Sequence, residues 1–133
     1  METYTETPYR PFKEEATDAL LDKEHYLVAL GTAADTVKLA TSIDDAIGVL
    51  VAKHPGDPHV NVRLLGKGGT VKVKAGGVIA KGARVTFGAG GKVVALTAVA
   101  GTYRTLGMKL SQGNSADGDI IELLDTIETR VVA

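Results

Sequence analysis

The sequence has no cysteine and no tryptophan, and it contains few aromatic residues of any kind. Among its 133 residues, phenylalanine and tyrosine together account for 5%. Without cysteine the chain cannot form a disulfide, a thiolate zinc site, an iron–sulfur cluster or a catalytic thiol. Its 15 basic and 16 acidic side chains give a formal net charge of −1. That balance lacks the basic excess typical of nucleic-acid-binding proteins, so we expect no nucleic-acid partner.

Long apolar runs are also missing, and none approaches the roughly 20 residues that a membrane-spanning helix needs. The first twelve residues are polar and include Glu2 and Glu6, which is not the pattern of a secretory signal. We therefore expect no membrane partner and a protein made in a cytoplasm. What the chain does have is 16 glycines and a hydrophobic content of 44%, which is enough for one packed domain.

Alternation of apolar and polar residues predicts β-structure through most of the chain. Val60, Val62 and Leu64 alternate with polar residues, which places one face of a strand in the core. Further strands, separated by glycine-rich turns, are predicted at 25–30, 36–41, 47–52, 71–74, 83–87, 92–97, 105–110 and 119–124. Helical spacing predicts a short helix over 12–23, and the segment 119–132 fits either a strand or a helix. The predicted fold is all-β, a small β-barrel or sandwich of short strands.

Segments of the first half align with segments of the second half at a nearly constant offset. Residues 21–28 align with 79–86 at an offset of 58 (79 − 21), and 36–41 align with 92–97 at 56 (92 − 36). Two later alignments share an offset of 59: 47–50 with 106–109 (106 − 47), and Leu64-Leu65 with Leu123-Leu124 (123 − 64). The alignment predicts two pseudo-symmetric β units, about 13–68 and 70–126, within one β domain that spans 13–133.

The segment before this domain, residues 1–12, is predicted to form an extended N-terminal arm. Its alternating threonines favour extended backbone, and its two prolines exclude a helix. We expect the arm to bind a partner as an added strand, with tyrosine and phenylalanine rings as anchors and an arginine as the polar anchor. The alternative is a terminus without fixed structure. The candidate binding residues are Thr3, Tyr4, Thr5, Pro8, Tyr9, Arg10, Pro11 and Phe12.

No motif for catalysis or metal binding stands out. The glycine-rich run at 66–70 precedes an alternating strand, whereas a phosphate loop precedes a helix. Two histidines flank the proline turn at 55–58, which is a poor metal site, and the turn at 114–119 lacks the full spacing of a calcium loop. The adjacent carboxylates Glu14 and Glu15 are interpreted as solvated surface. We therefore expect no enzyme activity, no cofactor and no metal.

A series of glycine-turn motifs runs through the second half. It comprises the turn and strand at 71–85, then Gly91-Lys92-Val93-Val94, then Leu106-Gly107-Met108-Lys109-Leu110, and the closing stretch at 116–124. This series resembles the small capsid decoration, or cement, proteins of tailed bacteriophages, and the resemblance covers about residues 47–124.

The resemblance implies a structural protein that binds the outer surface of a phage head and clamps neighbouring subunits of the major capsid protein. It also implies self-association, as a homotrimer or else a dimer. The protein would be made in the host bacterial cytoplasm and end on the outside of the virion.

Two other function classes stay open. One is a surface-exposed module that binds a glycan or receptor, as a head fibre does, although few aromatic rings are available to stack on sugars. The other is a carrier domain of the biotinyl or lipoyl type, with Lys92 as the modified lysine after Gly90-Gly91. The residues that carriers use beside that lysine are absent here.

Overall fold

The computed structural model describes residues 7–41 and 46–133, and this part of the chain contains strands and turns but no α-helix. The elements in chain order are β1 (Tyr9–Glu14), β2 (Leu27–Leu30), β3 (Thr36–Leu39), β4 (Ala46–Lys53), β5 (His59–Leu64), β6 (Thr70–Lys74), β7 (Arg84–Phe87), the 3-10 turn η1 (Ala89–Gly91), β8 (Val93–Ala95), β9 (Gly101–Lys109) and β10 (Ile120–Val132). Within the described ranges, no helix has the length and apolar character needed to cross a membrane.

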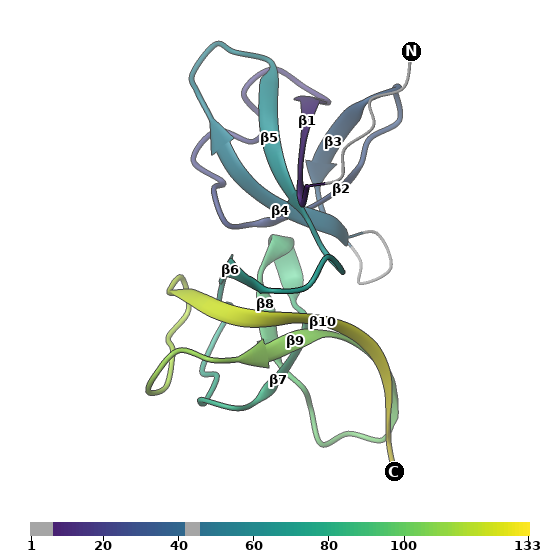
Figure 1. Cartoon of the computed structure of the whole chain (residues 1–133), viewed down its shortest axis with the longest axis vertical. Coiled ribbons are helices and arrows are strands. Elements are labelled where there is room, and N and C mark those ends of the chain that lie inside the picture. The colour runs from purple at the N-terminus through teal and green to yellow at the C-terminus, as the bar shows by residue number, and fades with distance from the viewer. Residues whose placement is uncertain (1–6, 42–45) are drawn as a thin grey trace.

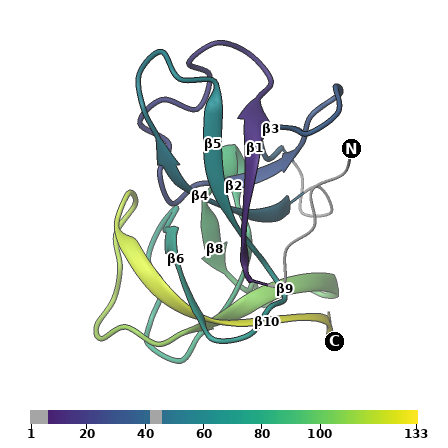
Figure 2. The ribbon, with the colours of Figure 1, turned by 45° about the horizontal axis from the view of Figure 1, so that its top comes forward.

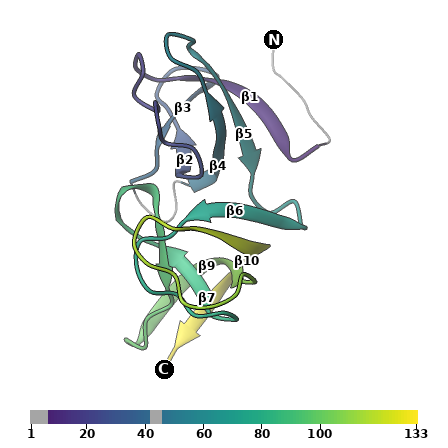
Figure 3. The same ribbon diagram turned by 90° about the vertical axis from the view of Figure 1, so that its left-hand side faces the viewer.

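The strands form a closed barrel and a second sheet. The barrel has the order β1-β3-β2-β4-β5, and β1 closes it by pairing antiparallel with β5 and parallel with β3. The second sheet has the order β6-β10-β9-β7-β8. Figure 1 shows the barrel above this sheet, and Figure 3 shows the short linker that leads from β5 to β6. The predicted all-β barrel or sandwich is confirmed.

The second sheet repeats the strand arrangement of the barrel. Read around the barrel from β1 in the other direction, the order is β1-β5-β4-β2-β3, which matches β6-β10-β9-β7-β8 strand for strand. The barrel is closed by the parallel pairs Lys13↔Thr36 and Glu14↔Val37. The second unit has one parallel bridge at the corresponding place, between Ala75 and Val93. The first unit is therefore a closed barrel, whereas the second is a five-stranded sheet with one isolated bridge at the place where the barrel closes.

The structural offsets differ slightly from those predicted by the alignment. Val37 and Val93 lie at corresponding places with an offset of 56 (93 − 37), which is the predicted value. In the last strand of each unit the offset differs. Gly48 of β4 pairs with Leu64, and Gly107, which occupies the same place in β9, pairs with Asp125. Leu64 therefore corresponds to Asp125, an offset of 61 (125 − 64) rather than the predicted 59. A shift of two residues keeps every side chain on the same face, so alternation alone could not distinguish the two registers.

Glycine is required at this corresponding pair of positions because another strand approaches closely. A Cβ atom on Gly48 would lie 2.6 Å from the carbonyl oxygen of Arg63, and one on Gly107 would lie 2.0 Å from that of Leu124. Real side chains do not tolerate such distances to backbone atoms. Glycine at these two positions therefore lets β4 approach β5, and β9 approach β10, in the same way.

Two clusters of buried apolar side chains hold the fold together. One fills the barrel and contains Phe12, Leu20, Val28, Val37, Leu50, Val60 and Val62. The other contains side chains from both units, among them Leu27 and Val49 of the barrel and Val73, Ile79 and Leu123 of the second unit. Because the units share this second core, separating them would expose apolar surface.

The predicted helix over 12–23 is wrong. Strand β1 continues to Glu14, and turns follow up to Tyr26. The carboxylate of Glu14 accepts hydrogen bonds from the backbone N–H groups of Asp18 (2.8 Å) and Leu20 (3.3 Å). Asp18 also has a positive φ of 55°, which interrupts a right-handed helix. The segment 119–132, left open above, is a strand from Ile120 to Val132.

Strands β9 and β10 extend beyond the second sheet as a two-stranded ribbon, which we call the C-terminal ribbon and define as residues 101–104 and 128–132. The two segments pair from Thr129↔Arg104 to Val132↔Gly101, beyond a register shift between Asp125 and Glu128. Figures 1 and 2 show the ribbon leaving the body toward the C-terminus. In the part of the barrel that the structure describes, β5 has no such extension, since it ends at the counterpart of Asp125.

Candidate functional site

The structure corrects the predicted arm, because its last residues belong to the barrel. Tyr9 pairs with Arg63, and the ladder continues along β1 and β5 as far as Lys13↔His59. The strand partner that the arm was expected to find on another protein is therefore, for Tyr9–Phe12, the β5 strand of its own chain. Thr3, Tyr4 and Thr5 lie outside the described residues.

Pro11 fits β1 without loss of a ladder hydrogen bond. Lys13 donates its N–H to the carbonyl oxygen of Asp35, on the side of β1 that faces β3. The backbone nitrogen of Pro11, two residues earlier, faces the same side, but it lies before the start of β3. Its missing N–H therefore leaves no gap in a ladder. The carbonyl of Pro8 accepts a hydrogen bond from Leu64 N–H at 2.6 Å.

Two of the predicted anchors are used within the barrel. Phe12 is 6% exposed and packs in the barrel core. The Arg10 guanidinium lies over the Phe12 ring, 4.3 Å from its centroid, and Arg10 Nη2 lies 3.1 Å from Asp35 Oδ1. Both side chains therefore stabilise the attachment of β1, so neither is available to anchor the chain on a partner.

Among the predicted ring and arginine anchors in the described part of the chain, Tyr9 is the exposed one, at 48%. It lines a groove of about 270 Å³ between the two units, together with Val49, Val51, Arg63, Lys72 and Glu122. One wall of the groove is β6, the edge strand of the second sheet. This groove lies beside a predicted binding residue and could receive a partner's side chain.

His25 connects the barrel to β6 beside this groove. Its carbonyl accepts the N–H of Lys74 at 2.9 Å. Burial lowers the pKa of His25 below its usual value, and the hydrogen bond with the Lys72 backbone only partly opposes that effect. Through its backbone carbonyl, His25 therefore helps to hold one edge of the second sheet against the barrel.

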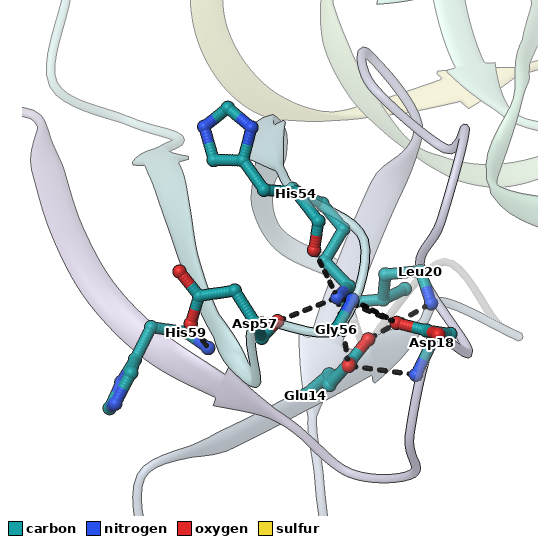
Figure 4. Close-up of polar contacts among 8 residues, drawn as sticks. Glu14, Asp18, Leu20, His54, Gly56, Asp57 and His59 are labelled. Carbon is teal, nitrogen blue, oxygen red and sulfur yellow. Dashed lines mark hydrogen bonds and ion pairs between the residues drawn. The ribbon is translucent and has the colours of Figure 1, made fainter.

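Lys53 is buried and closes the turn between β4 and β5. Figure 4 shows its partners Glu14, Asp18, His54 and Asp57. The side chain of Lys53 is fully buried, and its ammonium nitrogen lies 3.2 Å from Glu14 Oε1 and 2.9 Å from Asp18 Oδ1. It also donates to the carbonyl oxygens of His54 (2.7 Å) and Asp57 (2.6 Å). Glu14, interpreted from the sequence as solvated surface, is instead buried and paired.

The contacts stabilise the charges of Lys53 and Asp18 in this cluster. Burial works to lower the pKa of Lys53, but hydrogen bonds and charge from Asp18 and Glu14 outweigh it and raise that pKa. The hydrogen bond from Lys53, with a second from the backbone N–H of Gly56, lowers the pKa of Asp18. The cluster is thus an internal ion network in which the lysine ammonium is surrounded by acceptors of its own chain.

A second buried ion pair joins the two units. Arg63 of β5 and Asp125 of β10 form a salt bridge, with 8% and 0% of their side chains exposed. Asp125 also accepts hydrogen bonds from the N–H groups of Gly66 (2.9 Å) and Lys67 (3.0 Å), and Arg63 donates to the carbonyl of Gly68 at 2.5 Å. The pair therefore holds the linker between the units as well as the strands on either side of it.

A third buried cation closes the loop after β9. Lys109 is 1% exposed. Its ammonium donates to the carbonyl oxygens of Ser111 (2.8 Å), Gln112 (3.4 Å) and Gly113 (2.7 Å). A buried ammonium needs such acceptors, so this loop conformation and the lysine depend on each other.

Within residues 7–41 and 46–133, no three or more His, Asp or Glu side chains are grouped so as to hold a metal ion. Figure 4 shows the rings of His54 and His59 pointing in different directions. In the turn at 114–119, Asp119 Oδ2 accepts the Ala116 N–H at 2.9 Å. Lys92, the carrier-type candidate, lies directly after η1 and its ammonium is 3.0 Å from Asp117 Oδ1.

The buried charges were not predicted from the sequence, although one of them left a signal. Asp125 follows Ile121 and Leu123 in steps of two, so it continues the core-facing positions one residue beyond the strand predicted at 119–124. A carboxylate at such a position requires a buried partner. Nothing in the local pattern indicates that this partner is Arg63, 62 residues away in the chain.

Comparison with models of known protein families and with curated proteins finds no match to this chain.

Proposed function

We propose that this protein is a non-enzymatic structural protein of a bacteriophage head. It would bind the outer surface of the shell and clamp neighbouring subunits of the major capsid protein, after synthesis in the bacterial cytoplasm. Self-association, as a homotrimer, is part of the proposal. The sequence motifs of residues 47–124 supply the family resemblance, and the use of buried charge in the fold supports a mechanical role.

The observation that carries the proposal is that the buried charged side chains of the described residues connect parts of the body to one another. These side chains are Glu14, Lys53, Arg63, Lys109 and Asp125. Four of them form ion pairs between distant parts of the chain, and Lys109 closes the loop that follows its own strand. In the described part, no buried side-chain nitrogen or oxygen lacks a hydrogen-bond partner. Such a body resists separation of its strands, which suits a clamp on a shell under internal pressure.

The proposed shell contact shifts toward the start of the chain. Since Tyr9–Phe12 form a barrel strand, the residues left for addition to a shell strand are Thr3, Tyr4 and Thr5. The exposed ring of Tyr9 lies beside the groove between the units and would contribute apolar contact at the base of that segment. Strand addition supplies affinity through the backbone, and repeated copies across a shell add multivalency.

The proposal is tested by co-sedimentation of the purified protein with expanded shells of the major capsid protein encoded in the same genome. Saturable binding at a fixed ratio to capsid subunits is expected. A variant lacking residues 2–6 should remain folded and lose binding, while Lys81→Glu, a change in an exposed turn, should bind normally. Absence of binding by folded full-length protein contradicts the proposal. Glycan binding without any shell would instead support the receptor-binding class.

A further inference from the structure

One edge of the C-terminal ribbon has no strand beside it in the described part of the chain. Along Glu128–Val132, β10 pairs with β9 on one side. On its other side β10 pairs with β6 only from Ile120 to Leu124. Figure 2 shows the ribbon projecting past the remaining strands. A strand edge of this kind offers unpaired backbone donors and acceptors to another strand.

Within the described residues, β5 of the barrel also has no counterpart of the ribbon segment of β10. The barrel closes without any strand beyond Leu64, the counterpart of Asp125. The ribbon is exposed, and Val131 in particular has 76% of its surface open to solvent. A two-stranded ribbon is only marginally stable by itself. The extension therefore needs an explanation other than completion of the five-stranded sheet.

The sequence of this edge is complementary to itself in one antiparallel register. When two β10 strands lie antiparallel with Thr129 opposite Thr129, Glu128 of each copy faces Arg130 of the other. In the same register Ile127 faces Val131. Opposite charges and apolar pairs placed directly across two strands stabilise their pairing.

The neighbouring registers lose this complementarity. Pairing centred on Arg130 would place the two guanidinium groups opposite each other, and pairing centred on Glu128 would do the same with two carboxylates. Within one copy, Glu128 Oε1 already lies 3.2 Å from Arg130 Nε and forms a salt bridge with Arg84. The pairing centred on Thr129 would extend these contacts into a network of alternating charge.

We propose that a second copy of this chain pairs with this edge, antiparallel and centred on Thr129. The result is a continuous four-stranded sheet, β9-β10-β10-β9, across a two-fold axis. This contact goes beyond the proposed function, because it joins two copies whatever larger assembly each belongs to. Charged residues on an edge normally prevent pairing with other strands. Here the charges of the two strands are complementary when a second copy pairs in this register, so the contact is specific for another copy.

A single cysteine tests the register directly, since the chain contains none of its own. In the proposed pairing the Cβ atoms of the two Thr129 residues are about 5 Å apart, so Thr129→Cys should form a disulfide-linked dimer under mild oxidation with oxidised glutathione. Thr102→Cys, at an exposed threonine on the other strand of the ribbon, is the matched control. It should cross-link at least about tenfold more slowly, because its counterpart lies across four strands. Equal rates for the two variants would overturn the proposal.

Charge variants in the Thr129→Cys background test the complementarity. Arg130→Glu alone makes two Glu–Glu pairs, and Glu128→Arg alone makes two Arg–Arg pairs, so each should slow cross-linking about tenfold. Mixed together, these two proteins can form heterodimers in which every facing pair has opposite sign. Mass spectrometry should therefore find mixed dimers well above the share expected from random pairing. Random proportions, with both variants shown folded by circular dichroism, would refute the register.

Discussion

Replacing Asp125 by alanine should destabilise the protein far more than the loss of one surface carboxylate. The substitution leaves the Arg63 guanidinium with 8% of its side chain exposed and no counter-charge. It also removes the acceptor of the N–H groups of Gly66 and Lys67, at 2.9 and 3.0 Å. Breaking a buried ion pair by removal of one partner costs about 3–5 kcal/mol. We expect a loss of that size in the free energy of unfolding.

The measurement is urea denaturation of the purified protein, followed by circular dichroism. Asp117→Ala is the matched control, because Asp117 also pairs with a lysine (3.0 Å to Lys92) but has 67% of its side chain exposed. Exposed pairs contribute about 0–1 kcal/mol. Hydrogen exchange should also show faster exchange of the linker amides Gly66 and Lys67 in the Asp125 variant.

A second variant separates the loss of the pair from the loss of packing. Arg63→Met combined with Asp125→Leu removes both charges, so no isolated charge stays buried, and it should cost less than Asp125→Ala alone. If Asp125→Ala is no more destabilising than Asp117→Ala, the ion pair does not hold the two units together. If the double variant is the less stable of the two, the cost does not come from an unpaired charge.

Three further outcomes are expected. Gly107→Ala should lower the free energy of unfolding by about 3 kcal/mol or more, because its Cβ would lie 2.0 Å from the carbonyl oxygen of Leu124. The control Gly77→Ala, whose Cβ would have no atom within 4 Å, should change it by no more than about 0.5 kcal/mol in the same denaturation assay. The pKa of Asp18 is lowered from 3.8 in the folded protein, so the contribution of its charge to stability is complete above pH 3.8 and is lost as the pH falls through the folded-state pKa. Asp18→Asn should therefore be less stable than wild type near neutral pH and equal to it in strong acid. The urea midpoints of the two proteins, measured against pH, check this. Removal of residues 1–6 should leave the melting temperature nearly unchanged, whereas removal of 1–12 takes Phe12 and most of β1 from the barrel and should lower it by at least about 10 °C. Equal melting temperatures would contradict the place of β1 in the barrel.

Much of the β-structure follows from local pattern. Alternation at Val60–Leu64 and Val71–Val73 places these residues on core faces, and the structure has strands at both places. The alignment of the two halves likewise matches the offset of 56 between Val37 and Val93. These features depend on side-chain periodicity and on glycine turns, which are properties of short stretches of chain.

The failures share a cause that lies outside any short stretch. Residues 12–23 have helical spacing, but the Glu14 carboxylate is held by Lys53, which is distant in the chain, and takes the N–H groups that a helix would need. Local propensity was overridden by a tertiary ion pair. In the same way, Tyr9–Phe12 look like a free arm until β5 is present to pair with them.

The sequence by itself determined the class of fold, the approximate repeat between its two halves, and the absence of any thiol chemistry, because these follow from composition and local periodicity. The tertiary structure decided which strands meet. It placed Arg63 against Asp125, closed the barrel with a strand that had the appearance of an arm, and left the edge of β10 open. Each of these depends on pairing between residues far apart in the chain, and alternating strands carry little information about their partners or about even shifts in register.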